Sequence, residues 1–127
     1  MAIQFTEAFA AIGSGDFEAS VTFYTAILGR EPDVRTNDVH AEFHLPGGFH
    51  LAIFRPRADG ADRFRNPPDR QGGLSLVFVV ADVESAAVEL ARFGGPSPSP
   101  IMRGSHGREI YGYDPDGNRI ILVDHAT

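Results

Sequence analysis

Cysteine is absent from the 127-residue sequence, so disulfides, zinc–thiolate sites and cysteine nucleophiles are all excluded. Lysine is absent as well: all eleven basic residues are arginine, which removes Schiff-base chemistry on a lysine amine. The sequence also lacks an apolar run long enough to span a bilayer, and no charged-then-apolar leader opens it. From these absences we expect a cytoplasmic protein that does not associate with a membrane.

Positive charge is scarce too. The formal net charge is −6, whereas a nucleic-acid binder needs a basic surface to neutralise phosphates, so we expect no nucleic-acid partner. Hydrophobic residues make up 43% of the chain, which is typical of a globular protein and not of a disordered one. A chain of this length suits a single domain, residues 1–127, with a core of its own.

The chain contains an internal repeat. Residues Asp16–Gly29 and Asp82–Gly95 both begin with Asp, an apolar residue and Glu, and both end on Gly thirteen residues after the Asp. Each Asp can cap a helix N-terminus, and each Gly suits the left-handed turn that ends a helix. Apolar stripes complete two predicted helices: Phe17, Val21, Tyr24 and Leu28 in the first, and Val83, Ala86, Ala87, Leu90 and Phe93 in the second.

Segments with strand character flank both predicted helices. One precedes each helix and two follow it: Ala8–Gly13, Val39–Leu45 and Phe49–Phe54 in the first half, and Leu74–Val80, Arg108–Tyr113 and Arg119–Asp124 in the second. A further short strand near Pro32–Arg35 and Pro100–Met102 would complete four strands per half. The sequence thus predicts two modules, about 5–54 and 74–124. Residues 55–73, rich in Arg, Pro and Gly, form a linker, either a solvated connector or a lid over a site.

Two motifs point to a family. FYTAILGREP (Phe23–Pro32) and DPDGNRIILV (Asp114–Val123) resemble the helix end and the closing turn and strand of the glyoxalase/bleomycin-resistance/dioxygenase (vicinal oxygen chelate) superfamily. The resemblance implies an α+β fold of two βαβββ modules. Their strands would form a curved, half-open mixed sheet with helices on the convex face and a small-molecule ligand inside. Such proteins usually pair, so a homodimer is expected.

The resemblance also locates the usual metal site of the superfamily. Its metal-binding members hold a divalent ion with side chains from the first and last strands of each module. Carried over to this sequence, three of those positions are Phe9, Ser75 and Ile121. Phe and Ile have no donor atom, and a neutral Ser is a poor ligand for transition metals. We therefore expect neither a metal nor another cofactor at the standard site.

Strand periodicity gathers polar side chains elsewhere. In the two central strands of the first half, Ala41, Phe43, Leu45, Leu51 and Ile53 suit a face packed on the helix, which leaves His40, Glu42, His44, His50, Ala52 and Phe54 on the opposite face. A short Gly-containing turn should make these strands neighbours, so the histidines and Glu42 would converge. Three interpretations remain open: a displaced metal site, a polar ligand-binding wall with a histidine as acid or base, or a solvent-facing surface or dimer contact.

The second half offers further candidates. Arg108 could clamp a ligand carboxylate or form a surface ion pair. Tyr111 and Tyr113 share a face and would either stack on a planar ligand or pack under the helix. Phe9, Val77 and Ile121 would give the cup an apolar floor, which favours an apolar or aromatic ligand.

These patterns support one leading function and two alternatives. The leading hypothesis is small-molecule binding without the standard metal, as in sequestration of a drug or metabolite. The alternatives are a metal-dependent lyase, isomerase or dioxygenase that uses a displaced His/Glu site, and a subunit with a regulatory or structural role. No catalytic residue is predicted; the candidate ligand-binding residues are Phe9, His40, Glu42, His44, His50, Phe54, Ser75, Arg108, Tyr111 and Ile121.

Overall fold

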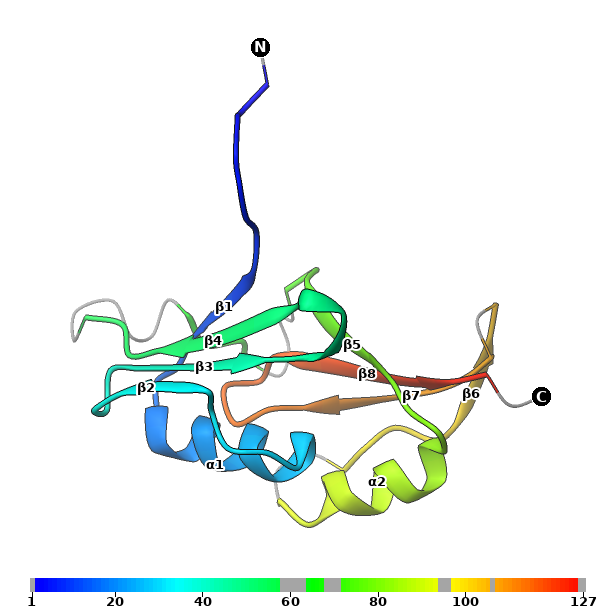
Figure 1. The fold of residues 1–127 in the computed structure, drawn as a ribbon. Coiled ribbons are helices and arrows are strands. Elements are labelled where there is room, and N and C mark those ends of the chain that lie inside the picture. The colour runs from blue at the N-terminus through cyan, green and yellow to red at the C-terminus, as the bar shows by residue number, and fades with distance from the viewer. Residues whose placement is uncertain (1, 58–63, 68–71, 94–96, 106, 126–127) are drawn as a thin grey trace. The chain divides into compact units, whose positions relative to one another are not determined.

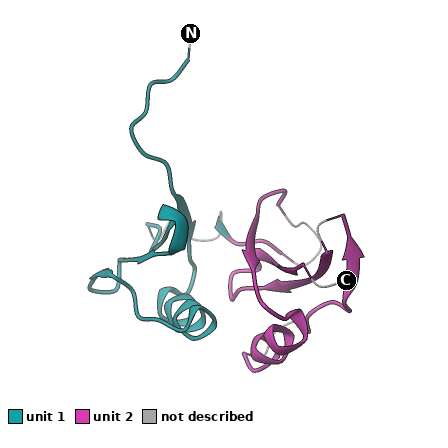
Figure 2. Cartoon of the chain, turned by 45° about the vertical axis from the view of Figure 1, so that its right-hand side comes forward, with its two compact units in different colours: residues 1–64 teal, residues 65–127 magenta. Residues whose placement is uncertain are grey.

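The chain folds as two compact units, residues 1–64 and 65–127 (Figure 2). The structure is a computed structural model that describes residues 2–57, 64–67, 72–93, 97–105 and 107–125. Neither of the two α-helices in these ranges is long and apolar enough to cross a membrane.

Unit 1 is a four-stranded mixed sheet with one helix (Figure 1). Its elements are β1 (Ala10–Gly13), α1 (Phe17–Leu28), β2 (Val34–Thr36), β3 (His40–His44) and β4 (His50–Phe54), with a short 3₁₀ turn at Pro46–Gly48. The strand order is β1-β4-β3-β2, in which β1 runs parallel to β4 and the other neighbours are antiparallel.

Unit 2 repeats this plan. Its elements are β5 (Ser75–Val79), α2 (Val83–Ala91), β6 (Met102–Gly104), β7 (Gly107–Tyr113) and β8 (Arg119–Asp124). The order β5-β8-β7-β6 matches that of unit 1, again with one parallel and two antiparallel pairs. The predicted α+β fold of two βαβββ modules is therefore confirmed. The short third strands are present as β2 and β6, each displaced two residues toward the C-terminus from the expected start.

Both helices begin where the capping pattern predicts. The Asp16 carboxylate accepts a hydrogen bond from the backbone N–H of Ala19, and Asp82 accepts one from Ser85, each at 3.1 Å. Gly29 ends α1 in the left-handed conformation, at φ 67°. The predicted end of the second helix is wrong, because α2 stops at Ala91. Its last backbone N–H groups close a tight turn with Arg92 in right-handed helical geometry, and Gly95 lies outside the described residues.

One face of each sheet packs against its helix. In unit 1 Ala41, Phe43, Leu51 and Ile53 are fully buried, as the alternation predicted, but Ala52, which was assigned to the opposite face, is buried as well. Phe17, Val21 and Tyr24 of the first helix stripe and Val83 and Leu90 of the second are buried. Leu28, Ala86 and Ala87 are half-buried, and Phe93, which lies beyond the end of α2, is 38% exposed. Leu45, assigned to the same face, follows the end of β3 and is half-buried.

The DPDGN motif forms the turn between β7 and β8. The Asp114 carboxylate accepts hydrogen bonds from the backbone N–H groups of Asp116 and Asn118, at 2.9 and 2.8 Å. Asn66, from the predicted linker, packs on this turn. Its backbone N–H donates to the Asp116 carbonyl at 3.0 Å, and its amide donates to the Asn118 side chain at 2.7 Å. This part of the linker is thus held by unit 2. Residues 58–63 and 68–71 of the linker lie outside the described residues.

Candidate functional site

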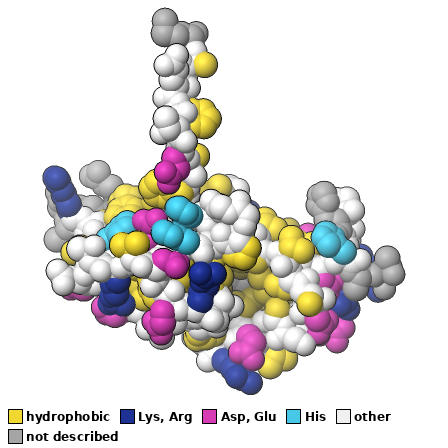
Figure 3. Space-filling view, viewed as in Figure 1, with side chains coloured by type: hydrophobic (Ala, Val, Ile, Leu, Met, Phe, Trp, Pro, Cys, Tyr) yellow, Lys and Arg dark blue, Asp and Glu magenta, His cyan; other side chains and the backbone are white. Residues whose placement is uncertain are grey.

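The face of the unit 1 sheet opposite α1 carries a group of polar side chains. On β3, His40, Glu42 and His44 alternate with the buried Ala41 and Phe43. On β4, His50 lies directly opposite His44 in the antiparallel ladder. Histidine and acidic side chains accordingly gather on the surface of this unit (Figure 3). We call His40, Glu42, His44 and His50 the His/Glu cluster.

Glu42 is the centre of the His/Glu cluster. One carboxylate oxygen, Oε1, lies 2.8 Å from His44 Nε2 and 3.4 Å from His50 Nδ1. The other oxygen, Oε2, lies 3.3 Å from His40 Nε2. The rings of His44 and His50 stack with their centroids 4.0 Å apart and their planes 12° apart. The four side chains therefore lie together, as the alternation of the two strands predicted.

Carboxylates fix the charge and position of this cluster. The hydrogen bond from His44 is the largest cause that holds the pKa of Glu42 below its ordinary value; partial burial opposes it, and His40 adds to it. Glu42 is therefore ionised at neutral pH.

The backbone N–H of His44 donates to Asp33 at 2.7 Å, which lowers the pKa of Asp33 and holds the end of β3. Glu7 brings a further carboxylate oxygen to 3.8 Å from His50 Nδ1, a contact that no sequence pattern indicated.

The three positions of the usual metal site hold different chemistry. Phe9 precedes β1 and is 54% exposed. The Ser75 hydroxyl accepts a hydrogen bond from Arg119 Nε at 2.7 Å, so it is engaged by a cation of its own sheet. Ile121 is half-buried on β8. By ladder register, Ala52 of β4 is the unit 1 counterpart of Ile121, because each lies third in its strand and two places after the hairpin pair. None of these four side chains is a good metal ligand.

The open face of unit 2 is aromatic and apolar. Tyr111 pairs with Ile121 and Tyr113 with Arg119, so these four side chains share a face. The Arg119 guanidinium lies 5.5 Å from the centroid of the Tyr111 ring, a cation–π contact. The tyrosines do not pack under α2, since Gly112, between them, meets Leu90 of that helix. The sequence analysis gave Arg119 no role in a site, although the alternation in β8 places it beside Ile121.

Beyond this pairing, exposed valines extend the same face on β5. Val77 lies opposite Ile121 in the parallel ladder and is 56% exposed, and Val79 is 66% exposed. A planar aromatic molecule could stack on such a surface, and its hydrophobic area would gain from leaving water.

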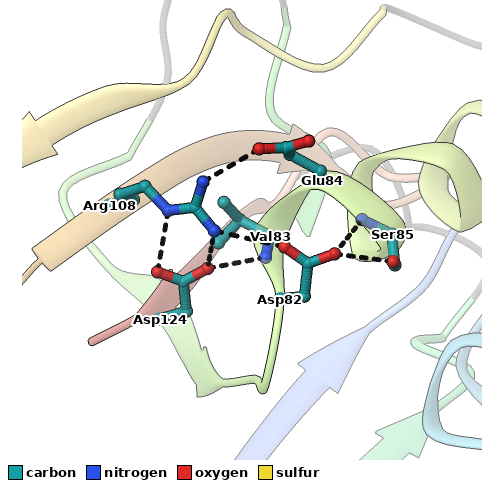
Figure 4. Close-up of polar contacts among 6 residues, drawn as sticks. All are labelled: Asp82, Val83, Glu84, Ser85, Arg108 and Asp124. Carbon is teal, nitrogen blue, oxygen red and sulfur yellow. Dashed lines mark hydrogen bonds and ion pairs between the residues drawn. The ribbon is translucent and has the colours of Figure 1, made fainter. Parts of the chain in front are cut away.

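Arg108 is not part of this face; of the two alternatives open for it, a ligand clamp and an ion pair, the structure shows ion pairs. It shares the helix side of β7 with the buried Ile110. Its Nε and Nη2 donate to both carboxylate oxygens of Asp124, at 3.1 and 2.7 Å, while Nη2 and Nη1 also donate to Asp82 and Glu84 (Figure 4). These carboxylates raise the pKa of Arg108, with Asp124 as the largest cause. The guanidinium therefore ties β7 and β8 to the start of α2.

Phe54 lies at the edge of the His/Glu cluster. It pairs with His40 across the β3–β4 ladder. Its ring makes an edge-to-face contact with Phe64, with centroids 5.3 Å apart. Phe54 thus packs against an aromatic side chain from the predicted linker and is half-buried.

Comparisons with known proteins agree with this geometry. The bleomycin-binding protein of bleomycin-producing Streptomyces verticillus, solved with copper(II)-bleomycin, shares 25% identity over 97% of this chain and 98% of its own, with a TM-score of 0.62. A glyoxalase-related enzyme from Fulvimarina pelagi shares 25% identity over 94% and 88%, with a TM-score of 0.68. A lactoylglutathione lyase from Agrobacterium tumefaciens, 21% identical over 94% and 93% with a TM-score of 0.65, shares the fold.

No curated protein matches the sequence significantly. The family model described as Glyoxalase/Bleomycin resistance protein/Dioxygenase superfamily matches residues 8–122, nearly the whole chain. This match, together with two βαβββ modules of identical strand order, shows that the chain belongs to the glyoxalase/bleomycin resistance protein/dioxygenase superfamily.

Proposed function

We propose that this protein binds an apolar or aromatic small molecule, as in the sequestration of a drug or metabolite. The observation that carries the proposal is the open face of unit 2, where the half-buried Tyr111 and Ile121 lie beside the exposed Val77 and Val79. Poor metal ligands, Phe9, Ser75 and Ile121, stand where the superfamily places metal ligands, so this face is suited to hydrophobic contact and ring stacking.

Two features support a planar ligand with a polar or charged edge. The Tyr111 ring and the Arg119 guanidinium already lie in contact, so both can engage one flat molecule. The similarity to a protein solved with copper(II)-bleomycin supports an antibiotic of that kind as a first compound to test. Homodimer formation and a cytoplasmic location belong to the same proposal.

The proposal is tested by thermal-shift screening with peptide antibiotics, aromatic acids and thiol conjugates, followed by calorimetric titration of each hit. A ligand that binds the folded state alone raises the unfolding temperature. Tyr111→Ala should weaken binding roughly 2- to 12-fold, since an aromatic pair is worth about 0.5–1.5 kcal/mol beyond its buried area. Tyr111→Phe should keep the affinity, because the ring is retained.

The matched control is Val88→Ala, on the exposed surface of α2, where the side chain is 58% exposed. This variant should bind each hit as tightly as the unaltered protein. The proposal is wrong if no compound in the panels raises the unfolding temperature, or if Tyr111→Ala and Val88→Ala bind a hit equally well.

A further inference from the structure

Two imidazoles and one carboxylate converge on a single point of unit 1. His44 Nε2 and His50 Nδ1 both approach the same oxygen, Glu42 Oε1, at 2.8 and 3.4 Å. One ligand atom from each of the three residues can be chosen so that all lie within 4.8 Å of one another. For comparison, the donor atoms of a tetrahedral zinc site lie roughly 3.3 Å apart, as bond lengths of about 2.0–2.1 Å require. A shift of the side chains by at most about 1.5 Å would therefore bring the donors to the separation that one small ion needs.

The chemistry of these donors selects a class of ion. Imidazole nitrogens suit zinc, nickel and copper, whereas magnesium and calcium prefer a shell made of oxygen atoms. Two histidines and one carboxylate give three protein ligands and leave a coordination position open for water or another molecule. The side chains of Glu42, His44 and His50 are 22%, 41% and 29% exposed, so an ion can reach them from solvent.

The supporting residues hold the three donors in place. β3 and β4 are the two inner strands of the sheet, and His44 and His50 form a directly opposed pair in their ladder. His40 Nε2 lies 3.3 Å from the second oxygen of Glu42, which orients the carboxylate. The stacked rings of His44 and His50, 12° from parallel, must tilt toward each other before both nitrogens can reach one ion.

We propose that Glu42, His44 and His50 form a binding site for one divalent transition-metal ion of the zinc, nickel and copper class. The site lies on β3 and β4 and shares no residue with Phe9, Ser75 or Ile121, the superfamily positions considered above. It also shares no residue with the open face of unit 2, on which the proposed function rests.

Calorimetric titration of the full, untagged chain with Zn²⁺ tests the site directly. We expect one ion bound per chain. Replacing an outer residue that orients a ligand typically costs 10- to 100-fold in metal affinity, so His40→Ala should weaken binding by roughly that factor. His44→Ala, His50→Ala and Glu42→Gln each remove a donor and should weaken binding more, by roughly 100-fold or beyond.

His125→Ala is the matched control, since it removes an exposed histidine that lies outside the cluster. Its Zn²⁺ affinity should be unchanged, and so should that of Tyr111→Ala, which separates this site from the proposed ligand face. As a second measurement, the electron paramagnetic resonance spectrum of the Cu²⁺-loaded chain should show coupling to two imidazole nitrogens and lose one of them in His44→Ala.

Circular dichroism confirms that each variant is folded before its affinity is compared. The site is refuted if the unaltered chain binds no Zn²⁺ in a one-to-one ratio. It is equally refuted if folded His44→Ala binds as tightly as His125→Ala, or if the Cu²⁺ spectrum is the same in both variants.

Discussion

Replacing Gly117 by Ala should destabilise unit 2 through two separable effects. The first is conformational, since Gly117 has φ 81° and a left-handed conformation costs an L-residue roughly 1–2 kcal/mol. The second is steric: a Cβ at this position would lie 2.3 Å from the backbone oxygen of Asn66. Asn66 would have to withdraw, which breaks its hydrogen bonds to Asp116 and Asn118. Each of these two hydrogen bonds is worth about 0.5–1.5 kcal/mol, so the conformational and steric effects together should cost about 2–5 kcal/mol.

Gly29→Ala separates the two effects. Gly29 also has positive φ, at 67°, but an added Cβ there would meet no described atom within 4 Å. This variant should therefore lose only the conformational part, about 1–2 kcal/mol. Urea unfolding with linear extrapolation measures both free energies, and the slopes should stay unchanged. If the two variants are destabilised equally, the residue 66 segment does not pack on the DPDGN turn, and the reasoning fails.

Three other changes give distinct expected outcomes. Phe43→Ala empties a fully buried position and should lower the free energy of unfolding by about 3–5 kcal/mol in urea titrations; a loss below about 1 kcal/mol would contradict its place in the core. The Ser85 hydroxyl and N–H hold the pKa of Asp82 below its ordinary 3.8. Its carboxylate therefore stabilises the fold above about pH 5, and this contribution is lost as the pH falls through the lowered pKa. Asp82→Asn lacks the titrating group, so its urea midpoint should fall less between neutral and acidic pH than that of the unaltered protein. Arg108→Gln should lower the urea midpoint, because it leaves the buried Asp124 with fewer hydrogen-bond donors. The affinity for any thermal-shift hit should be unchanged; weaker ligand binding would show that Arg108 takes part in the binding site.

Local patterns predicted the elements of this fold because their causes are local. Asp16 and Asp82 cap their helices through N–H groups three residues away, and the alternation of β3 sorts buried from half-buried side chains within the strand. On β4 the same alternation fails at Ala52, which is buried. The His/Glu cluster followed from the same alternation together with a short hairpin, which fixes the register of His44 opposite His50.

Contacts between distant segments were not predictable in this way. Arg108 donates hydrogen bonds to carboxylates from the start of α2 and from the end of β8, and no sequence pattern around residue 108 predicts these contacts. Composition alone assigned Asn66 to a linker, yet Asn66 contacts a turn fifty residues later in the chain. The end of α2 depends on the tight turn that its last backbone N–H groups form, and the presence of Gly95 in the sequence does not predict where that turn occurs.

The equal registers of the two hairpins carry a consequence for how such a protein can change. Glu42, His44 and His50 stand at the same ladder positions as Tyr111, Tyr113 and Arg119. In both modules the helix-side residues of these hairpins carry the packing, so the opposite side can differ between the copies. One copy has a carboxylate and two imidazoles there, and the other has two phenol rings and a guanidinium. Grafting the first trio onto the second hairpin would therefore exchange chemistry between copies with little disturbance of either core.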